Sequence, residues 1–126
     1  MSTILVVEDD PGIRDAMQDA LETEGYAVVT AANGKDALDE LRRIETPSLI
    51  LLDLMMPIMS GGEFLAALRN ALDLPDIPVV VVSAWPAEAA KLQHETQGYV
   101  RKPVALDVLL ETVARFCRRE GEDAAA

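Results

Sequence analysis

One stretch decides the fold: Leu49-Ile50-Leu51-Leu52-Asp53, four aliphatic residues followed directly by a carboxylate. A short, continuous apolar run bounded by polar residues is typical of a strand that is buried on both faces, as in the centre of a parallel sheet. Burying a lone carboxylate at the end of such a strand is costly unless other groups stabilise it. Partners for Asp53 are therefore expected at the ends of the other strands.

The other apolar runs do end in suitable side chains. Acids follow the first run, a hydroxyl group follows the fourth, and a lysine follows the last. The segments are Ile4-Leu5-Val6-Val7 before Glu8-Asp9-Asp10, Val79-Val80-Val81-Val82 before Ser83-Ala84, and Tyr99-Val100 before Arg101-Lys102-Pro103. If these runs are parallel strands, all of these groups lie at one edge of a sheet.

Strand and helix patterns alternate along the whole chain. The expected strands cover residues 3–8, 26–31, 48–53, 78–83 and 99–101. Helices are expected between Asp10-Pro11 and Gly25, from Asn33-Gly34 to before Pro47, from Ser60 to about Leu72, from near Pro86 to about Gln97, and over about 104–119. This order predicts an α/β fold, a doubly wound five-stranded parallel sheet with five helices. Residues 1–120 are expected to form one domain, and residues 121–126 a short flexible tail.

Composition narrows the range of partners and compartments. The 126 residues carry 22 acids against 11 Lys and Arg, a formal net charge of -11. Nucleic acid and anionic membranes are therefore unlikely partners. Cys117 is the only cysteine, so an intrachain disulfide is excluded and a reducing cytoplasm is the expected location. There is no apolar run of membrane-spanning length and no signal-peptide pattern.

The polar strand ends indicate metal and phosphoryl chemistry. In an open parallel sheet, ligands bind beyond the carboxyl ends of the strands. If the first and third strands are neighbours, Glu8, Asp9 and Asp53 crowd one pocket, and a divalent cation such as Mg²⁺ relieves their repulsion. A carboxylate can then attack phosphorus and form an aspartyl phosphate. Lys102 and Ser83 can supply the positive charge and the hydrogen-bond donor that phosphoryl oxygens need.

Five segments together resemble the response-regulator receiver domain of two-component signalling, and in particular the single-domain chemotaxis regulators. The resemblance implies a flavodoxin-like sheet of strand order 2-1-3-4-5. The segments that carry it are Ile4-Leu5-Val6-Val7-Glu8-Asp9-Asp10, Leu51-Leu52-Asp53-Leu54-Met55-Met56-Pro57, Ser60-Gly61-Gly62, Val82-Ser83-Ala84 and Tyr99-Val100-Arg101-Lys102-Pro103.

The resemblance also implies a role for each site residue. Asp53 is then the phosphoacceptor and, with Asp9, a direct ligand of Mg²⁺, while Glu8 acts mainly through metal-bound water. The remaining roles are a backbone carbonyl ligand from Met55, phosphate binding and switching by Ser83, Ala84, Tyr99 and Lys102, and a cis Lys102-Pro103 peptide bond.

The implied function is that of a stand-alone signalling receiver rather than an enzyme. It accepts a phosphoryl group from a histidine kinase or phosphotransfer protein, catalyses its own phosphorylation and dephosphorylation, and then binds a downstream protein or relays the group. A monomer or weak dimer is expected. One alternative is a binding module of the same fold that works without phosphorylation. Another is a Mg²⁺-dependent phosphatase, but such enzymes place a second acid where this chain has Met55.

Two features depart from the family pattern. The segment between Ser83 and Lys102 is short by about one helical turn, so the helix after Pro86 is expected to be shortened or displaced. Met55 and Trp85 occupy the positions that control access of water to an acyl phosphate. Because neither side chain can orient an attacking water, slow self-dephosphorylation is expected.

Overall fold

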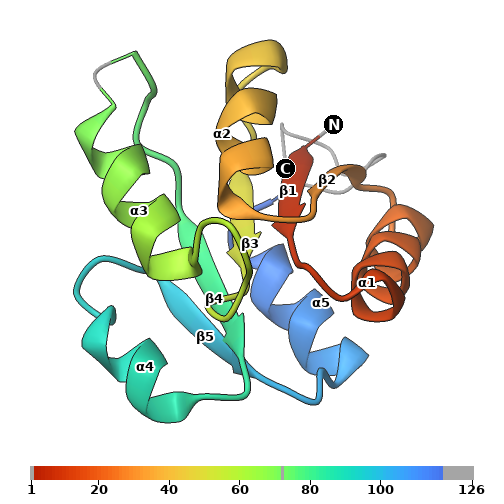
Figure 1. The fold of residues 1–126 in the computed structure, drawn as a ribbon. Helices are drawn as coiled ribbons and strands as arrows, with labels where there is room; N and C mark the ends of the chain where they lie inside the picture. Colours follow the sequence, from red (N-terminus) through yellow and green to blue (C-terminus); the bar gives the residue numbers. More distant parts are fainter. Residues whose placement is uncertain (1, 72, 118–126) are drawn as a thin grey trace.

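Strands and helices alternate in the computed structural model, which describes residues 2–71 and 73–117 (Figure 1). The strands are β1 (Thr3–Val7), β2 (Ala27–Ala31), β3 (Leu49–Leu52), β4 (Val79–Ser83) and β5 (Gly98–Arg101). The helices are α1 (Pro11–Thr23), α2 (Gly34–Arg43), α3 (Gly61–Asn70), α4 (Pro86–Lys91) and α5 (Leu106–Ala114). None of the described helices is long and apolar enough to cross a membrane.

The five strands form one parallel sheet of order β2-β1-β3-β4-β5, which confirms the predicted topology. In the centre, Val7 of β1 lies opposite Leu52 of β3. The N–H of Asp53 continues this pairing by donating to the carbonyl of Val7 over 3.0 Å. The residues that follow β1 and β3 therefore leave the sheet side by side.

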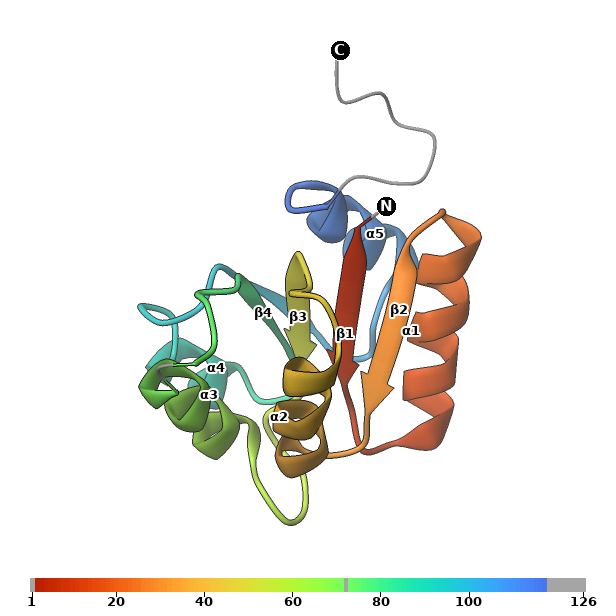
Figure 2. The same cartoon turned by 90° about the horizontal axis from the view of Figure 1, so that it is seen from above.

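Each face of the sheet is covered by its own layer of helices (Figure 2). One core joins Leu5, Ile50 and Val79 to residues of α2, α3 and α4, such as Phe64. The other core joins the alternate strand residues to α1 and α5. Because both faces are buried, β1, β3 and β4 are apolar apart from Thr3 at the start of β1 and Ser83 at the end of β4.

Three of the helices begin at the side-chain caps that the sequence predicts. Asp10 Oδ1 accepts the N–H of Ile13 over 3.0 Å at the start of α1, and Asn33 Oδ1 accepts the N–H of Asp36 over 2.9 Å at the start of α2. Ser60 and Glu63 form a capping box at the start of α3. These caps place the first turns of the helices at the carboxyl edge of the sheet, around the strand ends.

The predicted helix from Pro86 to about Gln97 is wrong at its end. Helix α4 stops at Lys91, and residues 92–95 form turns. Gln97 is bound to the start of β4, where its N–H donates to the carbonyl of Val79 over 2.8 Å and its Oε1 accepts the N–H of Val79 over 2.7 Å. Because the chain must return to this point before β5 begins at Gly98, too few residues remain for a longer helix.

The predicted last helix, over about 104–119, is also too long. Helix α5 covers Leu106–Ala114, and then the N–H groups of Arg115 and Phe116 donate to carbonyls three residues earlier, which tightens and ends the helix. Val108 is exposed, because Leu109 and Val113 define the buried stripe of α5. Residues 118–119 of the prediction and the proposed tail at 121–126 lie outside the described residues.

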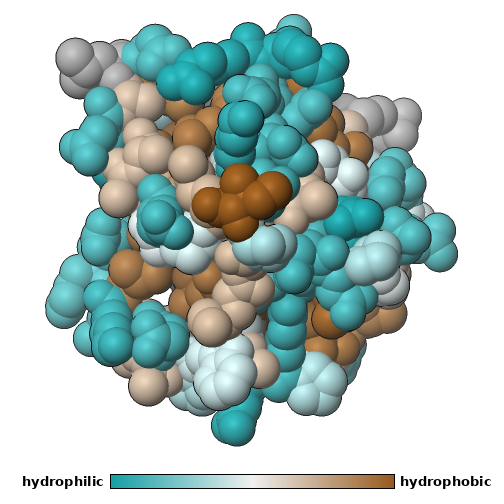
Figure 3. Space-filling model, in the orientation of Figure 1, coloured by the Kyte–Doolittle hydropathy of each residue, from teal (hydrophilic) through white to brown (hydrophobic). Residues whose placement is uncertain are grey.

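Some hydrophobic side chains are exposed at the surface. On the face shown in Figure 3, hydrophilic residues predominate and hydrophobic ones form small separate groups between them. Large hydrophobic side chains are nevertheless exposed at six described positions: Met55, Ile58, Trp85, Tyr99, Leu106 and Val108. Met55, Ile58 and Trp85 belong to the loops that follow β3 and β4, so they lie at the same edge of the sheet as the acidic strand ends.

Gly61 allows α3 to begin directly against the residues that follow β3. A Cβ atom at Gly61 would lie 2.4 Å from the carbonyl oxygen of Asp53 and 2.7 Å from Cα of Leu54. We therefore expect Gly61→Ala to lower the free energy of unfolding by about 1–3 kcal/mol, because backbone atoms must move. Gly62→Ala is the matched control, since its nearest neighbour is Ser60 Oγ at 4.0 Å. Equal urea midpoints for the two variants would contradict this packing.

Candidate functional site

Three carboxylates converge where β1 and β3 end. Glu8 and Asp9 follow β1, and Asp53 follows β3. Glu8 is 1% exposed and Asp53 is 5% exposed, whereas Asp9 is half-buried. One carboxylate oxygen from each residue lies within 4.8 Å of the other two. The sheet order thus brings together the three acids that the sequence predicts to share a pocket.

Lys102 supplies the positive charge of this pocket from the end of β5. Its Nζ lies 2.5 Å from Oε1 of Glu8 and 3.5 Å from Oδ2 of Asp53. The N–H of Lys102 donates to the carbonyl of Ser83 over 3.0 Å, which fixes the chain beside β4. The Lys102–Pro103 peptide bond that follows is cis. The ammonium group is therefore closer to Glu8 than to Asp53.

One ammonium group does not balance three carboxylates. Burial raises the pKa of Asp53 to about 7, the neighbouring Glu8 and Asp9 act in the same direction, and Lys102 opposes them. For Lys102, burial lowers the pKa, but the attraction of Glu8 and Asp53 outweighs burial and leaves its pKa above the ordinary value. Asp53 therefore resists ionisation until more positive charge enters the pocket.

The donor set fits a hard divalent cation. Oε1 of Glu8 is buried and accepts no hydrogen bond of normal geometry, although the Lys102 ammonium lies close to it. Clustered carboxylates with one partly open side suit Mg²⁺, which takes few protein oxygens and keeps several water ligands. A cation here would supply the positive charge that the pocket around Asp53 lacks.

Ser83, Ala84 and Tyr99 lie beside this pocket, at the end of β4 and on β5. Ser83 is fully buried, and its Oγ accepts the N–H of Trp85 over 3.0 Å. The hydroxyl of Tyr99 donates to the carbonyl of Ser83 over 2.9 Å, and Ala84 is exposed. The backbone of Ser83 therefore connects the β4 end to the aromatic side chain of β5.

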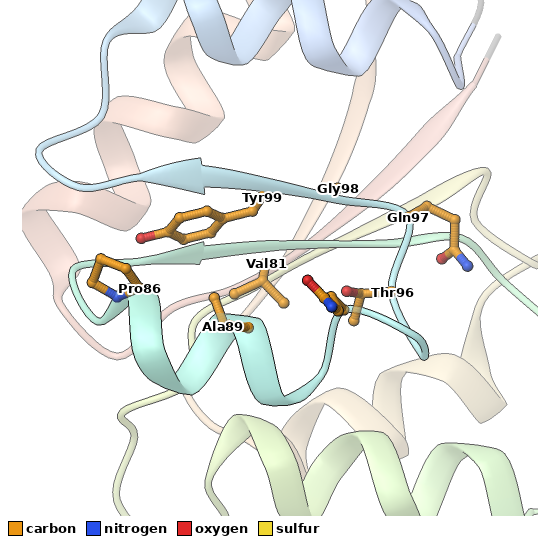
Figure 4. A pocket seen from close by; sticks show the side chains of 9 residues that line it. Val81, Pro86, Ala89, Thr96, Gln97, Gly98 and Tyr99 are labelled. Carbon is orange, nitrogen blue, oxygen red and sulfur yellow. The ribbon is translucent and has the colours of Figure 1, made fainter.

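Tyr99 also lines a cavity of about 420 Å³ between α4 and β5. Figure 4 shows its ring lying along the cavity with the hydroxyl toward Pro86, while Thr96 and Gln97 lie at the other end. The early end of α4 leaves Val81 of β4 as part of the cavity wall. Helix α4 and β5 are therefore separated by a polar-rimmed groove rather than packed closely along their length.

Met55 and Trp85 occupy the loops beyond β3 and β4, where the sequence places the residues that control water access. Their exposed fractions are 55% and 54%. The N–H of Met55 donates to Oδ1 of Asp53 over 3.4 Å. Both residues are thus next to site groups with much of their surface in solvent.

The loop after Met55 contains strain that no sequence pattern identified. Ile58 has a φ of 68°, and the N–H of Met59 donates to the carbonyl of Pro57 over 2.7 Å across it. A β-branched residue with positive φ is rare, and such strain is common near functional sites.

Arg14 is part of the site although no motif identified it. Its guanidinium group donates to the carbonyl oxygen of Glu8 over 3.0 Å and to that of Asp9 over 3.5 Å. A basic residue in the first turn of a helix, where acids are favoured, is the sequence signal that could have drawn attention to it.

Comparisons with known proteins agree with this arrangement. Residues 4–114 match the family described as "Response regulator receiver domain". Response regulator MprA of Mycolicibacterium vanbaalenii is 36% identical over 123 residues, which are 95% of this chain and 52% of MprA. An uncharacterized 14.6 kDa protein of Leptolyngbya boryana is 37% identical over 117 residues, covering 90% of this chain and 88% of that protein. The chain thus spans about half the length of MprA but most of the Leptolyngbya protein.

A solved structure is similar over nearly the same span. The response regulator protein TrrA of Thermotoga maritima, crystallised in complex with Mg(2+)-BeF, gives a TM-score of 0.82 at 32% identity. The similarity covers 93% of this chain and 100% of TrrA.

The raised pKa of Asp53 has a consequence for stability in the absence of divalent cations. Because the folded state holds the proton more strongly than the unfolded state does, stability falls as pH rises from about 4 to about 7. We expect Asp53→Asn to raise the free energy of unfolding at pH 8 by about 1–3 kcal/mol. This gain should shrink as pH falls toward 4.

Urea unfolding in a chelator at several pH values measures this effect. Asp10→Asn is the control, since Asp10 is exposed and asparagine can also cap α1. An Asp53→Asn protein that is no more stable than the wild type at pH 8 would contradict the electrostatic description of the site.

Proposed function

Because the chain belongs to the response regulator receiver domain family, we propose that it accepts a phosphoryl group on Asp53 from a histidine kinase or a phosphotransfer protein, with Mg²⁺ as cofactor. One observation carries the proposal: the buried Asp53 carboxylate lies between two further acids and the Lys102 ammonium at the carboxyl edge of the sheet. The Mg(2+)-BeF complex of TrrA supports Mg²⁺ as the cation.

In this proposal, the carboxylate oxygen of Asp53 attacks the phosphorus of a phosphohistidine. The new P–O bond forms as the P–N bond breaks, and the imidazole of the donor takes up a proton. Bound Mg²⁺ would neutralise negative charge on the transferred group. Asp9, Asp53 and the backbone carbonyl of Met55 would hold the cation, and Glu8 would act through its water ligands.

Lys102 is close enough to Asp53 to move to the transferred phosphoryl group. Its Nζ is already 3.5 Å from Oδ2 of Asp53, so a small movement away from Glu8 would bring it to an oxygen of the transferred group. The bound cation would offset the positive charge that Glu8 loses when Lys102 moves away from it. Lys102 would thus stabilise the phosphorylated state electrostatically, as a flexible point charge.

Ser83, Ala84 and Tyr99 would convert phosphorylation into a change of surface. The Ser83 hydroxyl would give up its hydrogen bond with the N–H of Trp85 and donate to a phosphoryl oxygen. The small side chain of the exposed Ala84 would let the loop after β4 approach the phosphoryl group. Because Tyr99 is bonded to the carbonyl of Ser83, this movement would reach the cavity beside α4. A downstream protein would bind the altered surface, or the phosphoryl group would be transferred to another protein.

Phosphorylation is tested with Mg²⁺ and a small acyl-phosphate donor, followed by intact mass measurement. We expect one added phosphoryl group in the wild type, none in Asp53→Asn, and none in a chelator. Glu45→Gln, an exposed position before β3, is the matched control and should be modified normally. A phosphoryl group that persists in Asp53→Asn would contradict the proposed acceptor.

The same experiment separates the alternatives. Repeated turnover of phosphomonoesters would instead indicate a phosphatase. Absence of any modification, also with phosphorylated kinases, would indicate a binding module that works without phosphorylation.

Met55 and Trp85 are proposed to slow hydrolysis of the phosphorylated Asp53. Their bulk would limit the access of water, and neither side chain can orient an attacking water molecule. Once phosphorylated, Met55→Asn should lose phosphate several-fold faster, because its amide can orient a water molecule. Trp85→Ala should also shorten the lifetime by opening the site. Phosphate loss is followed by mass after donor removal, and unchanged lifetimes in both variants would refute this role.

A further inference from the structure

Arg14 holds the two consecutive residues that follow β1. Its Nη1 donates to the carbonyl of Glu8 over 3.0 Å and reaches that of Asp9 over 3.5 Å. Both residues belong to the acid cluster, but the contacts go to their backbones and not to their carboxylates. Arg14 therefore acts on the path of the chain between β1 and α1, from which both acidic side chains extend.

The position of Arg14 is unfavourable for the helix that carries it. It lies in the first turn of α1, where exposed N–H groups give the helix end a partial positive charge and acids are favoured. No acid occupies that turn. A basic residue at such an unfavourable position is expected to make other interactions that compensate. For Arg14 these are its contacts with the carbonyls of Glu8 and Asp9.

Arg14 contacts the carbonyls of Glu8 and Asp9 although acidic side chains also lie near it. A cavity of about 370 Å³ between α1 and α2 is lined by Arg14 together with Asp36, Asp39 and Glu40. The hydrogen bonds recorded for the guanidinium nevertheless go to the carbonyls of Glu8 and Asp9. Both contacts come from Nη1, and the planar guanidinium fixes the directions of its N–H bonds, whereas a lysine ammonium rotates freely on a flexible stem.

Arg14 completes the fixation of Glu8. The Glu8 N–H donates to the carbonyl of Ala31 over 3.0 Å, its Oε2 accepts the N–H of Asp10 over 3.2 Å, and its Oε1 pairs with Lys102. The carbonyl is the one remaining polar group of Glu8, and Arg14 binds it. Without Arg14, a part-buried carbonyl would lose its recorded partner and the loop would be free to rotate at that peptide.

We propose that Arg14 is a positioning residue of the metal centre: it fixes the backbone of Glu8 and Asp9 so that their carboxylates converge with Asp53 on Mg²⁺. This inference rests on the proposed function, because it assumes that the acid cluster binds the cation. It assigns Arg14 to the site through the backbone of Glu8 and Asp9, without contact with the cation or the phosphoryl group.

A simple charge effect predicts the opposite outcome for one variant. If Arg14 acted only as a nearby positive charge, it would repel Mg²⁺, and Arg14→Met would tighten binding. Arg14→Lys would then leave binding unchanged, because the charge remains. If Arg14 acts by positioning, both variants weaken binding, since neither keeps the rigid Nη1 group that contacts both carbonyls.

The test is calorimetric titration of the full chain with Mg²⁺ for the wild type, Arg14→Lys and Arg14→Met. Lys35→Met is the matched charge control, since Lys35 is exposed in the first turn of α2 at the same edge of the sheet. We expect the Mg²⁺ dissociation constant to rise on the order of 10-fold in Arg14→Met, the lower end for residues that orient metal ligands. Arg14→Lys should show a smaller rise, and Lys35→Met none.

Urea unfolding in a chelator distinguishes positioning from loss of the fold. Arg14→Lys should unfold cooperatively near the wild-type midpoint while its Mg²⁺ affinity is reduced, and saturating Mg²⁺ should restore phosphorylation of Asp53. Wild-type affinity in Arg14→Lys, or equal or tighter binding in Arg14→Met, would overturn the positioning role. Absence of Mg²⁺ binding by the wild type itself would instead overturn the proposed function on which it rests.

Discussion

Repulsion among three carboxylates beside one ammonium group is the constraint on which the rest of the structure depends. Glu8, Asp9 and Asp53 lie together because β1 and β3 are neighbours in a parallel sheet, and Lys102 reaches them from β5. The backbone around the acids is held closely by neighbouring groups. The carbonyls of Glu8 and Asp9 are bound by Arg14, and Gly61 lets α3 approach the backbone of Asp53.

The same repulsion connects stability with function. A pocket whose central carboxyl group has its pKa raised to about 7 is less stable when that group is ionised. In the proposed function, a cation that relieves this charge would also prepare Asp53 to act as a nucleophile. Lys102 is shared between Glu8 and Asp53, so in the proposed function an added cation or phosphoryl group would change its partners. The site is therefore strained electrostatically in the direction that a bound divalent cation would relieve.

The sequence predicts the sheet and the convergence of the acids well, because both follow from where apolar runs end. Glu8 and Asp53 are polar residues directly after buried strands, and parallel order places them together. The ends of α4 and α5 were mispredicted, because pairing of Gln97 with Val79 and the tightened turn after Ala114 are not visible in helical periodicity. Arg14 was missed because its role depends on backbone carbonyls, which carry no sequence pattern.

A crystal structure of this protein with Mg²⁺ and beryllium fluoride tests the central claim most directly. The account predicts a beryllium fluoride group on a carboxylate oxygen of Asp53, Mg²⁺ held among Glu8, Asp9 and Asp53, and Lys102 moved from Glu8 to a fluoride. An adduct on another residue would contradict the account. So would an ordered Mg²⁺ away from the three acids, or a Lys102 that stays paired with Glu8 beside a fully formed adduct.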